Sequence, residues 1–186
     1  KNCIKLIGTN YTLIRDEILE IKKKIKKTRS SNILISPGGK NWKNFCFKIT
    51  KILNPLLKRT DIKIYVSSGT DIVADKDINL NICKDFKEQN KILILGPIVF
   101  GYSGYSAIER SVLNIPSINF CLNQNQRDIY QLLKKTNIIP SSSIYSKHFI
   151  KKLNNYIKSS SNKTMKNVSP YNIKGKYLVY DKLMNG

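Results

Sequence analysis

The most constraining feature of this sequence is an alternation of short apolar runs with longer segments of helical periodicity. Short apolar runs bounded by turn-forming residues are typical of buried strands, whereas apolar residues spaced three or four apart are typical of helices. When strands and helices alternate, the strands form a parallel sheet and the helices cover it. The sequence therefore predicts an α/β fold, with a Rossmann-like parallel sheet and helices on both faces.

The boundaries of these elements follow from the same pattern. Strands are expected at residues 32–36, 62–68, 77–83, 98–101 and 116–122, with a small strand near residue 138. Helices are expected at residues 15–27, 42–55, 106–114, 127–135, 146–158 and 173–184. The second helix should end at Pro55, because proline has no backbone N–H to donate.

One short run is ambiguous. NKILIL, residues 90–95, fits a strand or a helix by periodicity alone. We favour a short helix that ends at Gly96, because a strand is expected directly after it. Residues 1–31 are expected to form an interdomain linker with its helix, and residues 32–186 a single Rossmann-like domain.

The chain is strongly basic, with a formal net charge of +21. Such a charge suits nucleic acid or an anionic membrane as a partner. The lysines are spread over most expected helices, however, and aromatic residues are not interleaved with them as a base-stacking platform requires. An AT-rich genome is the favoured explanation of the lysine content, so nucleic acid is not the expected partner. A basic surface still favours a phosphate-bearing ligand.

The cysteine and histidine content argues against a metal site. The four cysteines are far apart, at Cys3, Cys46, Cys83 and Cys121. No CxxC pair occurs, and the single histidine, His148, is expected on the surface of a late helix, so no metal or other cofactor is predicted. Four reduced thiols and no long apolar run suit a cytoplasmic protein without a membrane span.

Three polar turns each follow an expected strand. They are SPGG (36–39), GYSGYSAIE (101–109) and NQNQ (123–126). Because the carboxyl ends of parallel strands share one edge of a sheet, these turns should converge there. Ligands of open α/β sheets bind at that edge, so the convergence is the main argument for a binding site.

The first two turns carry groups that suit phosphate. Gly38 and Gly39 let backbone amides approach an anion at the start of a helix, although a plain tight turn explains them equally well. In the second turn Ser103, Gly104 and Ser106 offer hydroxyls and helix-start amides, which suit a diphosphate.

Glu109 lies about one turn into the helix that follows the second turn. A carboxylate repels phosphate, so its expected partner is a neutral group with donors, and a ribose diol fits. The alternative is an ion pair between Glu109 and a lysine on a solvated helix face. In the third turn Asn125 and Gln126 suit sugar hydroxyls or phosphate oxygens, and the alternative is a polar turn that caps the next helix.

Several segments together resemble one known family. They are LIGTNYTLIRDEIL (6–19), NILISPGGKNWKN (32–44), GYSGYSAIERSVLNIPSINF (101–120) with the following QNQ, and KGKYLVYDKL (174–183). In this order they resemble the C-terminal domain of the UDP-sugar hydrolases of pseudaminic acid biosynthesis. That family is related to the GT-B glycosyltransferases, including the UDP-N-acetylglucosamine transferase of peptidoglycan synthesis.

The resemblance implies the C-terminal half of a GT-B fold and assigns roles to residues. Gly39 and Gly104 would line the diphosphate, Ser106 would supply a hydroxyl there, Glu109 would hold the uridine ribose, and Asn125 and Gln126 would face diphosphate and sugar. The loop at Asp85 and Phe86 corresponds to the region beside uracil. The chain departs from the family pattern at Ser103, Lys40 and Trp42, and Lys40 would add a phosphate contact.

The function implied by this resemblance is a UDP-sugar-binding domain of a hydrolase that releases a diacetamido-trideoxy hexose from UDP. The catalytic group is unassigned and is expected in an N-terminal domain preceding the linker, which would be a partner along with the UDP-sugar. One alternative is a UDP-sugar-dependent GT-B glycosyltransferase domain. Another is a non-catalytic basic binding module.

Overall fold

Six strands form one fully parallel sheet in the order β3-β2-β1-β4-β5-β6. The computed structural model describes residues 4–25, 30–38, 42–57, 61–67, 80–121, 123–134, 139–141, 151, 155 and 169–185. The strands are β1 (Ile33–Ile35), β2 (Ile64–Ser67), β3 (Leu80–Cys83), β4 (Ile98–Tyr102), β5 (Ser117–Phe120) and β6 (Ile139–Ser141). The predicted α/β fold with a parallel sheet is confirmed.

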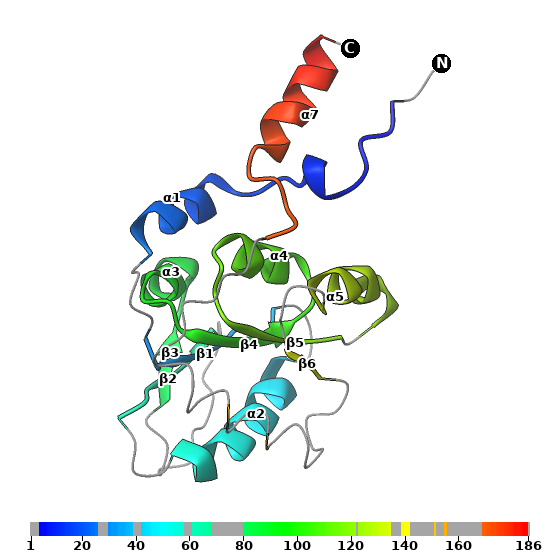
Figure 1. The fold of residues 1–186 in the computed structure, drawn as a ribbon. Helices are drawn as coiled ribbons and strands as arrows, with labels where there is room; N and C mark the ends of the chain where they lie inside the picture. The colour runs from blue at the N-terminus through cyan, green and yellow to red at the C-terminus, as the bar shows by residue number, and fades with distance from the viewer. Residues whose placement is uncertain are drawn as a thin grey trace.

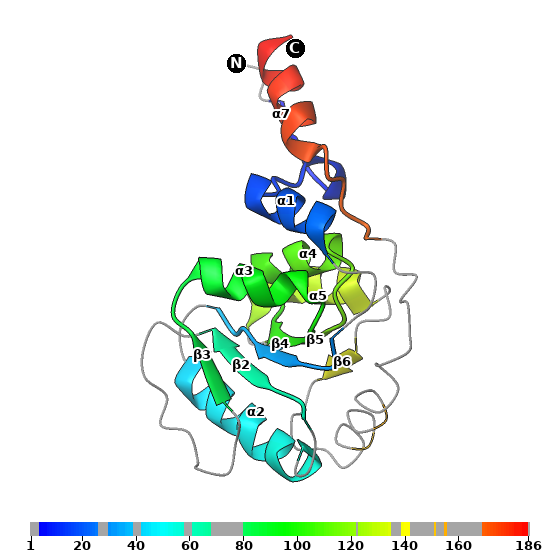
Figure 2. The ribbon, with the colours of Figure 1, turned by 90° about the vertical axis from the view of Figure 1, so that its left-hand side faces the viewer.

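Helices cover both faces of the sheet (Figures 1 and 2). The described helices are α1 (Asp16–Lys24), α2 (Trp42–Leu57), α3 (Phe86–Ile94), α4 (Tyr105–Val112), α5 (Arg127–Lys134) and α7 (Gly175–Met184), with short 3-10 turns η1 (Thr9–Tyr11) and η2 (Gln124–Gln126). Helix α2 covers one face, and α3, α4 and α5 cover the other. None of these described helices has both the length and the apolarity that crossing a bilayer requires.

The alternation of side chains along β1 explains how both faces are buried. Ile33 and Ile35 point into the apolar cluster under α2, whereas Leu34 points into the cluster under α3 and α4. All three residues are fully buried. A strand buried on both faces has no polar side, which is why the short runs in this sequence are continuously apolar.

Helix α1 packs on the layer formed by α3 and α4 (Figure 2). Ile14, Ile18 and Ile21 are buried in the same cluster as Leu93 and Val112. The segment predicted as a linker is therefore attached to this domain by apolar contacts. The first turn of α7 lies against the chain just before α1, where a Cβ on Gly175 would be 2.3 Å from the Thr12 carbonyl oxygen.

Two boundaries differ from the sequence-based prediction. Helix α2 continues through Pro55 to Leu57, because a proline in the last turn removes one N–H donor without blocking a long continuation. The strand expected at residues 77–83 is observed at Leu80–Cys83. The helix expected before Gly96 is α3, as favoured. His148 and nearly all of the helix expected at 146–158 lie outside the described residues.

Candidate functional site

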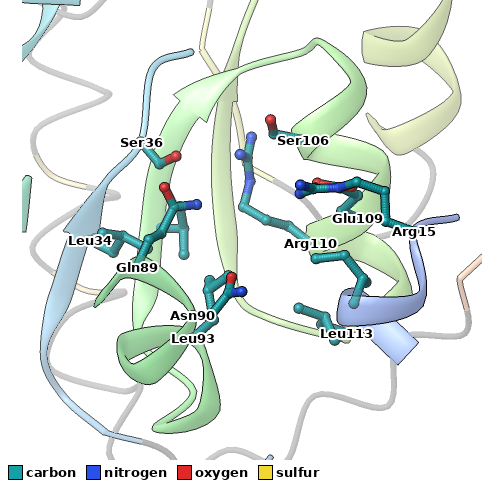
Figure 3. Close-up of a pocket in the computed structure, with 12 residues that line it drawn as sticks. Arg15, Leu34, Ser36, Gln89, Asn90, Leu93, Ser106, Glu109, Arg110 and Leu113 are labelled. Atoms are coloured by element: carbon teal, nitrogen blue, oxygen red, sulfur yellow. The ribbon is translucent and has the colours of Figure 1, made fainter. Parts of the chain in front are cut away.

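A narrow crevice opens where the strand order of the sheet reverses, between β1 and β4 (Figure 3). Its walls come from the start of α1, the ends of β1 and β4, and the facing sides of α3 and α4. The helices that flank the crevice, α3 and α4, cover the same face of the sheet, and Ser36 and Ser106 lie at its end nearest the carboxyl edge of β1 and β4. The crevice as a whole has room for about one water molecule in this conformation.

Glu109 is the one carboxylate among the residues that line the crevice. It lies on α4 and only 6% of its surface is exposed. Arg15 donates to both carboxylate oxygens, from Nε to Oε1 at 2.7 Å and from Nη2 to Oε2 at 3.0 Å. The alternative of an ion pair with a lysine on a solvated helix face is therefore wrong, since Glu109 is buried and its partner is an arginine 94 residues away.

Arg15 connects Glu109 to the first residue of α3. Its guanidinium carbon lies 5.4 Å from the ring centre of Phe86, which is an exposed side chain. The hydrogen bond from Arg15 to Glu109 is the main cause that raises the pKa of Arg15. Asp85 caps α3 by accepting a 2.8 Å hydrogen bond from the Glu88 backbone N–H, so its side chain has a structural role.

A second arginine, Arg110, lies deeper in the same crevice and is only 3% exposed. Its Nη2 donates to the Tyr102 carbonyl oxygen at 3.0 Å and to Asn119 Oδ1 at 2.6 Å. Both partners are neutral. Burial is the main cause that lowers the pKa of Arg110 to about 10, with Glu109 acting in the opposite direction. The guanidinium thus stays charged at neutral pH.

Gly101 on β4 makes room for this arginine. A Cβ at that position would lie 2.4 Å from the Ser36 carbonyl oxygen and 3.0 Å and 3.1 Å from Arg110 Nη2 and Nη1. Glycine is therefore required by the close approach of the end of β1 and the guanidinium of Arg110 to the same point of β4.

Unpartnered buried polar atoms gather at this place. Among the described residues, the buried side-chain atoms without a hydrogen-bond partner are Ser103 Oγ, Arg110 Nε and Asn119 Nδ2. All three belong to the β4–α4 junction or to the neighbouring strand β5. Buried polar groups are usually paired, so this concentration requires an explanation.

Of the predicted site residues that the structure describes, two lie in the crevice. Ser106 and Glu109 line it, together with Ser36 at the end of β1. Ser103 is fully buried beside it, and its backbone N–H donates to the Phe120 carbonyl oxygen at 2.8 Å.

The remaining predicted residues lie along the same edge of the sheet or outside the described chain. Gly38 follows β1 and Gly104 starts α4, whereas Asn125 and Gln126 form part of η2 after β5. None of these four lines the crevice. Gly39 and Lys40 lie outside the described residues, as does the Trp42 side chain.

Two of these glycines have different structural requirements. Gly38 has a φ of 65°, a left-handed conformation that favours glycine. Gly104 has a φ of −93°, and a Cβ there would contact nothing within 4 Å. The fold itself therefore does not need a glycine at residue 104, and the missing side chain leaves open space at the start of α4.

Sequence reasoning missed Arg15 and Arg110 as site residues. Arg15 was identified only as part of a linker motif, and its pairing with Glu109 depends on how α1 docks. Arg110 directly follows Glu109 on a short helix whose residues 107–112 are all buried. The signal that was available is Gly101, because a glycine inside a predicted strand indicates a close approach of another group.

The described residues contain no cluster of three or more His, Cys, Asp or Glu side chains that could hold a metal ion. No protein-family model matches the chain, and no curated protein sequence matches it either. The geometry of the crevice and the fold are therefore the observations from which a function is argued.

Proposed function

We propose that this chain is the UDP-sugar-binding domain of a hydrolase that releases a diacetamido-trideoxy hexose from UDP. The observation that carries the proposal is the position of a buried carboxylate, Glu109, and a hydroxyl, Ser106, on α4 at the reversal point of a doubly wound sheet. Nucleotides bind at this point in such sheets. The likeness of residues 6–19, 32–44 and 101–126 to the hydrolase family supplies the choice of uridine.

In this proposal the ribose diol donates two hydrogen bonds to Glu109. The carboxylate now holds Arg15, so the nucleoside has to displace that side chain. The Arg15 side chain is 45% exposed, which makes the displacement feasible because the guanidinium can turn into water. Moving Arg15 also frees the exposed ring of Phe86, which then offers a flat apolar surface to the uracil.

The proposed reaction transfers the sugar from UDP to water. The bond between the anomeric carbon and the diphosphate oxygen breaks, the water oxygen takes its place, and a base accepts the released proton. The described crevice residues hold the nucleotide and are not assigned the role of that base. Catalysis is proposed to need groups beyond this crevice.

Calorimetry with the diphosphates of uridine, adenosine, guanosine and cytidine tests the proposal. UDP should bind at least about 10-fold more tightly than the purine diphosphates, because the proposal assigns the base position beside Phe86 to a uracil. The titration is repeated with a chelator, and the affinity should be unchanged because the proposal uses no metal. Equal affinity for all four nucleotides would rule out the uridine assignment.

A further inference from the structure

Among the described residues that line the crevice, positive charges outnumber negative charges by one. Its charged residues are Arg15, Arg110 and Glu109. Arg15 and Glu109 neutralise each other through two hydrogen bonds. Arg110 is buried, with only 3% of its surface exposed, and its two hydrogen-bond partners in the described chain are neutral. A buried charge normally has an ionic partner, because burial without one is costly.

The guanidinium of Arg110 also has unused donors. It has five N–H groups, and both of its hydrogen bonds in the described chain use Nη2. Nε is buried without a partner, and no bond of Nη1 occurs within the described residues. The donors that remain, Nε–H and the N–H groups of Nη1, can each donate a charge-assisted hydrogen bond to an oxyanion.

Two hydroxyls lie beside this fork. In Figure 3 the guanidinium of Arg110 lies between the side chains of Ser36 and Ser106, and the hydroxyl of Ser36 faces the same space. The contacts at Gly101 agree with this view, because the Ser36 carbonyl oxygen and both Arg110 Nη atoms lie within 3.1 Å of the place where a Cβ on Gly101 would be. Ser106 lies in the first turn of α4, where backbone N–H groups have no helical partner.

We propose that Arg110 is the phosphate-binding cation of this crevice, and that it holds a phosphate oxyanion together with the hydroxyls of Ser36 and Ser106. The identification of that oxyanion as part of a UDP-sugar diphosphate rests on the proposed function. The anion subsite itself rests on a buried guanidinium that hydrogen-bonds only to neutral groups within the described residues and has an unpartnered Nε. An oxyanion at this place supplies the missing counter-charge and accepts from the unused donors.

The test measures binding of UDP, uridine and inorganic pyrophosphate by calorimetry to the unaltered chain and to Arg110→Met. Methionine keeps most of the volume and removes the charge and the donors. We expect Arg110→Met to bind UDP and pyrophosphate roughly 10- to 100-fold more weakly, the range for losing a charged hydrogen-bond partner. Uridine, which has no phosphate, should lose less than about 2-fold.

Lys51→Gln is the matched control, because Lys51 is an exposed cation on α2, on the opposite face of the sheet. It removes one positive charge from the molecule without touching the crevice, and its pyrophosphate affinity should stay within about 2-fold. Equal losses from both variants would show that pyrophosphate senses only the overall charge. Unchanged pyrophosphate affinity in Arg110→Met would also overturn the proposal.

A purely structural role for Arg110 gives a different result. Arg110→Met would then lower the melting temperature and weaken uridine and UDP by the same factor, because both effects would come from a disturbed crevice. If Arg110→Met does not fold, a double variant that carries both Ser36→Ala and Ser106→Ala tests the proposal instead. It should weaken pyrophosphate by about 5-fold or more through two lost hydrogen bonds, and an unchanged affinity would overturn the proposal.

The same titrations separate this inference from the proposed function. If UDP binds no better than pyrophosphate, and pyrophosphate binding depends on Arg110, the uridine assignment is wrong and the anion subsite stands. If UDP binds well and Arg110→Met leaves that affinity unchanged, the nucleotide function stands and the subsite is wrong. If neither ligand binds the unaltered chain, both are wrong.

Discussion

Glu109 has one observed partner and one proposed partner, and the two compete for the same oxygens. Arg15 occupies both carboxylate oxygens at hydrogen-bonding distance. A ribose diol would need the same two oxygens. The residue therefore either anchors α1 to α4 or binds a nucleoside, with Arg15 holding the site closed until the ligand arrives.

Glu109→Gln separates these roles. We expect it to weaken UDP binding by about 10-fold or more, because glutamine loses the charge and turns an amide donor toward a pair of donors. Calorimetry measures the change. Glu20→Gln is the matched control, since Glu20 is an exposed carboxylate on α1 that pairs with Lys23, and it should leave the UDP affinity unchanged.

The 2′-deoxy form of UDP tests directly whether Glu109 contacts the ribose diol. It should bind the unaltered chain more weakly than UDP, yet differ little from UDP on Glu109→Gln, where the diol contact is already damaged. A Glu109→Gln variant that folds normally and binds UDP as tightly as the unaltered chain would show that Glu109 serves only to anchor Arg15.

A second prediction at the scale of residues concerns the order in which the cysteines react. Burial raises the pKa of Cys46 to about 12 and is the main cause that raises the pKa of Cys83 to about 11. Cys121 is exposed. Because the thiolate is the reactive form, iodoacetamide at pH 8 should alkylate Cys121 well before the other two. Peptide mapping by mass spectrometry checks this, and rapid labelling of native Cys46 would contradict the burial. Cys3 lies outside the described residues.

At the scale of elements, a substitution on α1 shows whether this helix belongs to the folded domain. Ile18 is 2% exposed and packs in the cluster shared by α3 and α4. Ile18→Ala should lower the free energy of unfolding by about 2–4 kcal/mol, through lost burial and a cavity. Urea unfolding measures this. Leu13→Ala, at an exposed position just before α1, should change it by less than about 0.5 kcal/mol.

The outcome decides whether the boundary predicted near residue 31 describes a physical unit. If α1 were an independent linker, Ile18→Ala would leave the main unfolding transition of the sheet unchanged. A shifted transition would instead show that α1 unfolds with the sheet, so that the Rossmann-like domain includes residues before the predicted boundary.

The elements were largely predictable from the sequence because their signals are local. Short apolar runs marked β1, β2 and β4, and α2 was marked by its apolar period. Strand β5 contains Ser117 and Asn119, and it was marked by the short PSINFCL run between a helix and a polar turn. The end of α2 was not predictable from Pro55 alone, since the cost of a proline depends on how much helix follows it. The ambiguous run at 90–95 was resolved correctly only because a strand had to follow it.

The site was less predictable because its contacts are not local. Ser106 and Glu109 were identified from one turn of sequence, and both line the crevice. The pairing of Glu109 with Arg15 spans 94 residues and depends on the docking of α1. Nothing in the local pattern distinguishes the fully packed Arg110 from a surface arginine, because burial of a charge is decided by tertiary structure.

For the whole molecule, the position of α7 raises the question of what belongs to the folded core. In both ribbon views α7 stands beyond α1, away from the sheet (Figures 1 and 2). Its contacts with the described chain are mainly with η1, and Lys176 forms an ion pair with Asp16. Large apolar side chains on α7 are exposed instead of buried, namely Tyr177, Tyr180, Leu183 and Met184, at 61–73%.

Removal of residues 173–186 should therefore leave the folded core intact. Gly175 is the only residue of α7 that is buried, and Tyr171, which packs in the cluster with α1, remains in the shortened chain. Exposed ion pairs contribute little, so the melting temperature should fall by no more than about 4 °C. The UDP affinity should be unchanged, because α7 supplies no residue to the crevice. Calorimetric melting and titration check both expectations, and a loss of stability as large as that of Ile18→Ala would show that α7 belongs to the core.

The shortened chain should also associate less in sedimentation, since it no longer presents the exposed apolar side chains of residues 173–184 to water.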